Sequence, residues 1–234
     1  MSNTEIRLSS KSIFKTLVAT SFLIIGLSLI SAFFRIYFHS NFRGTAWLFD
    51  VSGDTNIPTW YASITLLFCA LLLSIIGWIR VQEKERYAKD WLILAGIFVM
   101  LSVDEVATIH EWIGNFVSVP VAKGFLNYGW VILGLPLVVL IGLYFRRFLK
   151  KLPSQIRHLF LFAAGLYVGG ALGIEIVNAK LEYIFGYDSL IYTLVTAVEE
   201  LCEMLGVAIF TYSLLTYLEK WVNCRSFQVH FKSK

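Results

Sequence analysis

Seven carboxylic acids lie in or beside three strongly apolar segments of the chain. The seven are Asp104, Glu105, Glu111, Glu175, Glu199, Glu200 and Glu203. An ionised acid at the centre of a spanning helix costs about 2.5 to 3.5 kcal/mol, so seven unpaired acids would cost roughly 15 to 25 kcal/mol. Protons, metal ions or basic partners must offset that cost, and each option predicts a different function.

The overall composition is that of an integral membrane protein. Of the 234 residues, 57% are hydrophobic and only 15% are charged, and the mean hydropathy is +0.69. Soluble domains are usually about half apolar and about a quarter charged. We therefore expect one all-α membrane domain over residues 1–234, with no separate soluble domain. The apolar run that begins at Phe14 is longer than a signal-peptide core, so we interpret it as a retained first span.

Six apolar segments are long enough to cross a bilayer as helices. A hydrocarbon core of about 30 Å requires roughly 20 residues at 1.5 Å per residue. Because no strand-like alternation appears, we expect a bundle of six transmembrane helices, with Trp and Tyr at the span ends as interfacial anchors. The expected spans are approximately residues 14–36, 58–79, 91–112, 128–144, 158–181 and 190–218.

Positive charge alternates between the loops. The N-terminal tail, the second loop, the fourth loop and the C-terminal tail are rich in Lys and Arg, whereas the other loops carry only Arg43, Lys123 and Lys180. The positive-inside rule then places both termini in the cytoplasm and predicts an inner or plasma membrane protein. With this orientation, the seven acids converge on the outer half of the bilayer. The net charge is +4, and the placement of the Lys and Arg residues in alternate loops indicates membrane topology and not nucleic-acid binding.

The acids in each segment also share a helix face. At 100° per residue, Asp104 and Glu111 fall on one side of the third expected helix, and Glu199 and Glu203 lie about 40° apart on the sixth. Glu175 lies on one side of the fifth. Three polar stripes that face one another would form a wet or metal-filled cavity. At least some of these acids should then be protonated or hold a cation.

A bound metal ion is one way to offset the charge. Carboxylates with one histidine favour Mn, Fe, Ca or Mg, with Zn also possible. The Glu-x-x-His pattern of di-metal bundles is absent, because Glu105 and His110 are five residues apart. His110 could instead be an interfacial histidine held by a backbone carbonyl or by Glu111. The candidate metal ligands are Asp104, Glu105, His110, Glu111, Glu175, Glu199, Glu200 and Glu203.

Other cofactors and redox sites are not expected. Four histidines, two of them on the cytoplasmic side, disfavour a three-histidine zinc hydrolase and a haem with paired axial ligands. There is no Gly-rich phosphate loop, GxSxG or CxxC, so we expect no nucleotide. Cys69 and Cys202 should pack inside helices, and Cys224 should be a free thiol.

Basic residues are the other possible partners of the acids. Arg35, Arg43 and Lys180 lie near the same expected side of the membrane, and a fixed ion-pair network would neutralise part of the cluster. Three cations and one histidine do not match seven acids. This alternative predicts a structural protein and not a carrier.

Two further motifs have ordinary interpretations. Gly165, Gly169 and Gly173 form a double GxxxG, which favours close helix packing inside one chain, with a homodimer as the alternative. The loop that contains Asp50 and Asp54 alternates oxygen-bearing residues as calcium loops do. Its glycine is misplaced for such a loop, so we expect a turn.

Three functions follow from these observations. The first is a small transporter or cation-coupled carrier that binds protons or a cation at the acids. The second is a membrane-embedded, metal-dependent enzyme acting on a lipid or another apolar substrate. The third is a structural or assembly subunit whose acids are ion-paired.

Overall fold

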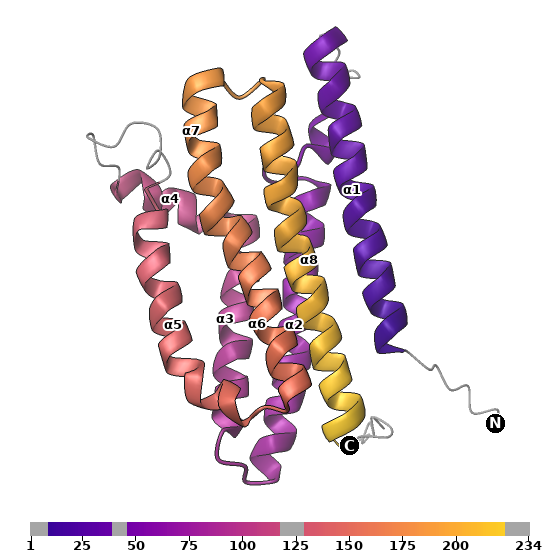
Figure 1. Ribbon diagram of the computed structural model, residues 1–234, viewed down its shortest axis with the longest axis vertical. Helices are drawn as coiled ribbons and strands as arrows, with labels where there is room; N and C mark the ends of the chain where they lie inside the picture. Colours follow the sequence, from indigo (N-terminus) through magenta and orange to yellow (C-terminus); the bar gives the residue numbers. More distant parts are fainter. Residues whose placement is uncertain (1–8, 39–45, 118–128, 223–234) are drawn as a thin grey trace, which may run out of the picture.

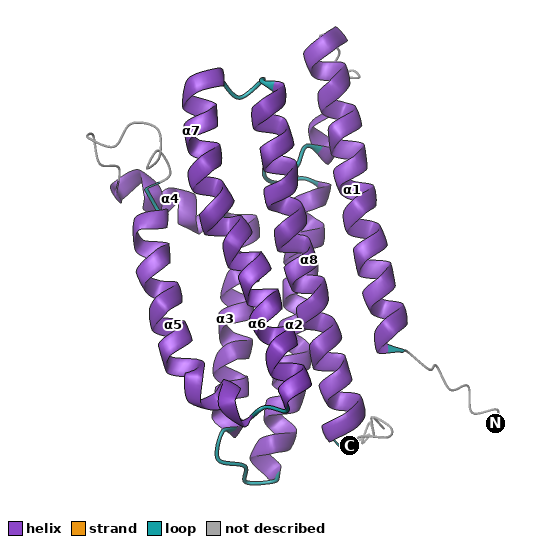
Figure 2. Cartoon of the chain, in the orientation of Figure 1, coloured by secondary structure: helices purple, strands orange, loops and turns teal. Residues whose placement is uncertain are grey.

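The computed structural model describes residues 9–38, 46–117 and 129–222. In these residues every regular element is helical and no strand occurs (Figure 2). The long helices lie side by side along the long axis of the molecule (Figure 1). The elements are α1 (Ser10–Phe38), η2 (Ala46–Phe49), α2 (Ile57–Gln82), α3 (Ala88–Ala107), α4 (Ile109–Val117), α5 (Val131–Lys151), α6 (Ser154–Val168), η3 (Gly169–Ile174), α7 (Glu175–Phe185) and α8 (Leu190–Trp221).

Five helical stretches in the described residues are long and apolar enough to cross a membrane. They are α1, α2, α5, the rod formed by α6, η3 and α7, and α8. The prediction of an all-α integral membrane protein is confirmed to this extent. The remaining expected span, the third at residues 91–112, corresponds to α3, which is 20 residues long but is excluded from this group by its charges. A crossing by α3 therefore stays a prediction, as do the membrane type and the orientation.

Short polar segments set the helix ends. The side chain of Asn56 accepts a hydrogen bond from the backbone N–H of Thr59 and so caps α2, which has Pro58 in its first turn. The Nδ2 of Asn56 also donates to the backbone carbonyls of Asp50 and Gly53, at 2.6 and 2.8 Å. These bonds fold the 50–56 segment into a turn, as expected.

The last long helix, α8, is the centre of the bundle. It contacts α1, α2, α6, η3 and α7, and it is the most buried of the five spans (Figure 1). Several of its polar side chains are therefore buried inside the bundle, namely Thr193, Thr196, Glu199, Thr211, Ser213 and Thr216. The start of α1 lies beside the end of α8, where the Ser10 hydroxyl donates to Glu219 Oε2 at 2.9 Å. Both helices thus meet at one end of the bundle, which agrees with termini on one side of the membrane.

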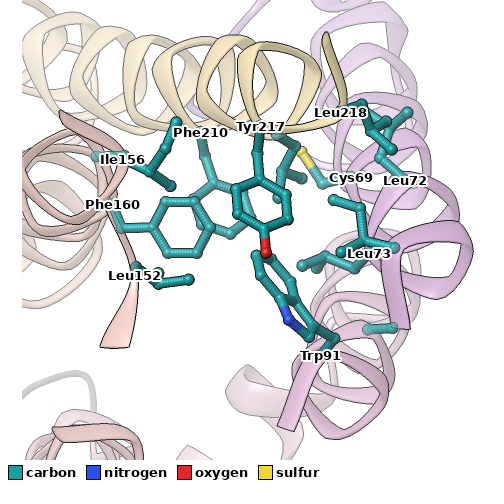
Figure 3. Close-up of a cluster of buried hydrophobic side chains, with 14 of the residues drawn as sticks. Cys69, Leu72, Leu73, Trp91, Leu152, Ile156, Phe160, Phe210, Tyr217 and Leu218 are labelled. Carbon is teal, nitrogen blue, oxygen red and sulfur yellow. The ribbon is translucent and has the colours of Figure 1, made fainter. Parts of the chain in front are cut away.

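An aromatic and aliphatic core fills the end of the bundle where α3 begins and α8 ends (Figure 3). Trp91 is fully buried there, with ring centroids 4.8 Å from Tyr217 and 4.9 Å from Phe148. Ile156 and Leu214 add close aliphatic contacts. In a bilayer such contacts stabilise helix association through van der Waals packing, because lipid tails are as apolar as the core. This end of the bundle is therefore the rigid one.

Two glycines allow α6 and η3 to approach α8 closely. A Cβ at Gly170 would lie 2.9 Å from the Glu199 carbonyl oxygen, and a Cβ at Gly206 would lie 2.9 Å from the Ala163 carbonyl oxygen. Both distances are shorter than real Cβ contacts, so only glycine fits without a shift.

The predicted glycine stripe does not make this contact. A Cβ at Gly165, Gly169 or Gly173 would meet nothing within 4 Å, and all three residues are exposed. The preferred interpretation, that this GxxxG packs inside the chain, is wrong. The four-residue spacing of these glycines correctly predicts a helix with one face of small residues. The contact with α8 is made by the adjacent face, on which Gly170 lies.

The glycine pair gives a direct stability test. We expect Gly170→Ala and Gly206→Ala each to destabilise the protein by about 1 to 3 kcal/mol, because the added methyl group overpacks a backbone contact. Thermal unfolding of the purified protein in detergent measures the effect.

The matched control is Gly169→Ala, which adds the same methyl group one residue away in open space. We expect it to leave the melting temperature unchanged or slightly raised, because alanine favours helix. Equal destabilisation by Gly169→Ala and Gly170→Ala would contradict the close approach of η3 and α8.

Candidate acidic site

Three of the predicted acids line one small cavity. Glu105 of α3 and Glu200 and Glu203 of α8 border a space of ≈ 10 Å³. That is about the volume needed to hold one water molecule. The remaining lining residues are Ala62, Thr65, Leu66, Tyr167, Met204 and Val207. These three acids lie on the third and sixth expected helices, whereas Asp104, Glu111 and Glu199 of the same predicted stripes do not line the cavity.

These three carboxylates have no basic partner in the described residues. Neither hydrogen bonds nor ion pairs connect Glu105, Glu200 or Glu203 to side chains in the described ranges. The charges that act on Glu200 and Glu203 are all those of other carboxylates, including each other and Glu105. The charge of His110 also acts on Glu105, although the two side chains form no ion pair. The cavity therefore collects like charges with no counter-charge in direct contact among the described residues.

Asp104 and His110 form a separate pair at a break between two helices. The third expected span was taken to run through residue 112, but α3 ends at Ala107 and Thr108 has a left-handed φ of 48°. Asp104 Oδ1 accepts from the His110 backbone N–H at 2.8 Å, and Asp104 Oδ2 contacts His110 Nδ1 at 2.8 Å. The carboxylate thus holds the start of α4 and orients the imidazole.

The break changes the placement of Glu111. The prediction that Glu111 shares the face of Asp104 assumed one continuous helix and is wrong, because the left-handed residue redirects the chain. Glu111 lies on α4 and is exposed. It is not among the residues that line the acid cavity.

Glu175 is held by an indole that sequence reasoning missed. Trp130 Nε1 donates to Glu175 Oε1 at 2.9 Å, and the Trp130 ring lies 5.1 Å from the His110 ring. From sequence, Trp130 is one of the interfacial aromatics at the span ends. No sequence signal indicates its contact with a glutamate 45 residues away.

Glu199 is hydrogen-bonded between α7 and α8. Asn178 Nδ2 donates to Glu199 Oε2 at 2.9 Å and to Thr196 Oγ1 at 2.7 Å. Asn178 is 3% exposed and Glu199 is 7% exposed, so this polar link is buried. The Oδ1 atom of Asn178 has no hydrogen-bond partner. The expected polar face of the fifth span therefore does meet the acids of α8.

The irregular turn η3 brings the α6–α7 rod against the acids. It is a π-helix of six residues, and such turns are frequent at functional sites. Gly170 lies within it, close to both the Glu199 carbonyl and the Glu203 side chain. The rod and α8 run side by side through this region (Figure 1). The sequence offers three glycines here but no signal for a change of helix type.

Asp54 joins the group from the loop before α2. Its charge acts on Glu105, Glu111 and Glu200. Burial raises the pKa of Asp54, and the nearby His110 opposes that shift. Sequence reasoning placed Asp54 in a turn, which is correct, but did not connect it with the acids. Proximity across 50 residues of chain is not visible in a local pattern.

Arg35, one of the three basic residues considered as partners of the acids, forms ion pairs with other carboxylates. Arg35 forms ion pairs with Asp50 and, from its Nε at 3.5 Å, with Asp188. It therefore connects the end of α1 to the two loops that precede α2 and α8. The predictions that involve Arg43 and Cys224 lie outside the described residues, whereas Cys69 is buried as expected and contacts Thr211 Oγ1 at 3.1 Å.

Metal binding stays a prediction from residue types. Across the described ranges, which contain all eight candidate ligands, no three His, Cys, Asp or Glu side chains are grouped so that they could hold one metal ion. The carboxylates that come together at the cavity come from two helices. Asp104, Glu175 and Glu199 are hydrogen-bonded to His110, Trp130 and Asn178, and Glu111 is exposed.

Residues 16–218 match the family model described as Domain of unknown function (DUF8692). This chain belongs to the DUF8692 family. The matched region runs from α1 to α8, so all seven acids and the cavity lie inside the DUF8692 domain. No curated protein and no solved structure matches the chain.

Asp104 offers a test of the helix break. We expect Asp104→Ala to destabilise the protein by about 1 to 2 kcal/mol, because the His110 backbone N–H and imidazole both lose their partner. Hydrogen exchange should become faster at the first amides of α4. The control is Glu111→Ala, which removes an exposed acid from α4 and should leave both the stability and the exchange rates unchanged. Unaltered exchange in α4 of the Asp104→Ala variant would rule out the capping role.

Proposed function

We propose that this DUF8692 protein is a multi-pass membrane carrier that binds protons or a small cation at its acid cavity. The observation that carries the proposal is the meeting of Glu105, Glu200 and Glu203 at one space, with no basic partner in the described residues. A carrier for an ion needs a buried charge that can be offset reversibly.

The energy of the three acids supports this proposal. If all three were ionised in a low-dielectric interior, they would cost roughly 8 to 10 kcal/mol on the membrane insertion scale. Protons shared among the carboxylates, or one bound cation, would offset most of that cost. A cavity of ≈ 10 Å³ suits a proton or a monatomic ion and not an organic solute.

The titratable groups also form a series from a loop into the bundle. Asp54 lies in the loop before α2 and acts on Glu105 and Glu200. Glu203 follows Glu200 by one turn of α8, toward the middle of that helix. Such a series could pass a proton stepwise from the loop end toward the bundle interior. The Asp104–His110 pair lies beside its entrance.

The other four acids fit a positioning role better than an ion-binding one. Asp104, Glu175 and Glu199 each have a hydrogen-bond partner, and Glu111 is exposed. These contacts are what a structural subunit would show for all seven acids. The cavity acids depart from that pattern, and for this reason the carrier is the better-supported function.

Proton flux provides the test. In liposomes containing a pH-sensitive dye, we expect Glu200→Gln and Glu203→Gln each to reduce flux more than about tenfold, because the amide cannot exchange a proton. Neither change should lower the melting temperature, since each removes an acid that has no hydrogen bond or ion pair to a described side chain. Glu85→Gln is the matched control, because Arg80 keeps its ion pair with Glu83.

Two results would count against the carrier. If proton flux is unchanged in both cavity variants, Glu200 and Glu203 take no part in transport. If flux is unchanged in both variants, while elemental analysis finds one divalent ion per chain that is lost in Glu203→Gln, the metal-dependent enzyme would be favoured instead.

A further inference from the structure

A second hollow lies far from the acids, between the start of α3 and the end of α5. It has a volume of ≈ 540 Å³, within the range of about 300 to 1,000 Å³ typical of ligand pockets. The lining residues are Tyr87, Asp90, Leu143, Tyr144, Arg146, Arg147 and Phe148. We call this hollow the basic groove.

The basic groove combines two guanidinium groups with an apolar floor. Arg146 and Arg147 are exposed, and across the described ranges neither has a carboxylate within ion-pair distance. Phe148 is buried against Trp91, with ring centroids 4.9 Å apart, so the floor is anchored in the packed core. Asp90 adds one negative charge at the opposite wall.

The position of the groove is that of a membrane surface site. Arg146 and Arg147 lie in the last two turns of α5, an apolar helix long enough to span a membrane. The C-terminal end of α5 and the start of α3 lie at the same end of the bundle (Figure 1). Beyond the groove, Leu140 on α5 and Ile93 on α3 have exposed apolar side chains.

These features fit a single amphiphilic ligand. Its charged headgroup would lie in the groove, and its apolar chains would lie along α5. Guanidinium groups bind phosphate oxygens with a planar fork of donors. Basic pockets at the ends of spanning helices are known to bind anionic lipid headgroups. The carboxylate of Asp90 requires hydrogen-bond donors in the ligand, and headgroup hydroxyls supply them.

We propose that the basic groove binds the headgroup of a monoanionic phospholipid that carries hydroxyls, the chemistry of phosphatidylglycerol. Two arginines and one aspartate leave one positive charge, which one phosphodiester neutralises. A zwitterionic lipid would leave that charge unmatched. This inference concerns a site separate from the acid cavity and does not depend on the proposed function.

The experiment compares lipids added to delipidated, full-length protein in detergent. We expect phosphatidylglycerol to raise the melting temperature more than phosphatidylcholine, because it binds only the folded state. The Arg146→Gln, Arg147→Gln double variant should lose that difference. The matched control is the Lys150→Gln, Lys151→Gln double variant, which removes the same charge in the next turn of α5 and should keep it.

Two further measurements test whether the site is specific and whether the ligand is a lipid. An Arg146→Lys, Arg147→Lys variant preserves charge and should retain part of the shift, which guards against a folding defect in the glutamine variant. An equal loss of the shift in both glutamine variants would overturn the site in favour of general charge attraction. An equal shift with soluble glycerol phosphate would overturn the lipid as ligand.

Discussion

The cost of placing carboxylates inside a membrane protein constrains the rest of this structure. The central position of α8 is the main answer to that constraint, since the helix is covered by α1, α2, α6, η3 and α7. Three acids then receive neutral or histidine partners, through Asn178, Trp130 and His110. Glu105, Glu200 and Glu203 instead border one small cavity and form no ion pair within the described part of the chain, so a proton or a bound cation could compensate them.

The two ends of the bundle therefore have different roles. One end is packed by Trp91, Tyr217 and Phe148 and holds α3, α5 and α8 together. The acids lie between the middle of the bundle and its opposite end. Two irregular segments lie beside them, the left-handed Thr108 and the π-helical turn at Gly170, and both interrupt regular helix. Irregular backbone inside a membrane bundle is tolerated where protein surrounds it or where it lines a cavity. The fold thus places its irregular geometry next to its titratable groups.

Sequence reasoning recovered the helices and the acids but not the contacts between them. Length and hydropathy locate spans because a bilayer imposes both, whereas helices that are apolar all round give little direction for packing. The glycine stripe illustrates this limit, since Gly170 makes the contact that Gly169 was expected to make. The break at Thr108 has no Gly or Pro to mark it. Asp54 and Trp130 reach the site through tertiary folding alone.

The central claim is that the cavity carboxylates share protons or a cation, because no basic side chain in residues 9–38, 46–117 and 129–222 forms an ion pair with them. Infrared spectroscopy of the protein in lipid at neutral pH tests this claim most directly, since a protonated carboxyl has a carbonyl stretch distinct from that of a carboxylate. The account predicts a protonated-carboxyl band, or a carboxylate band sensitive to added cation, that weakens in Glu203→Gln. A spectrum in which every carboxyl is ionised, insensitive to cations and unchanged by that substitution would contradict it.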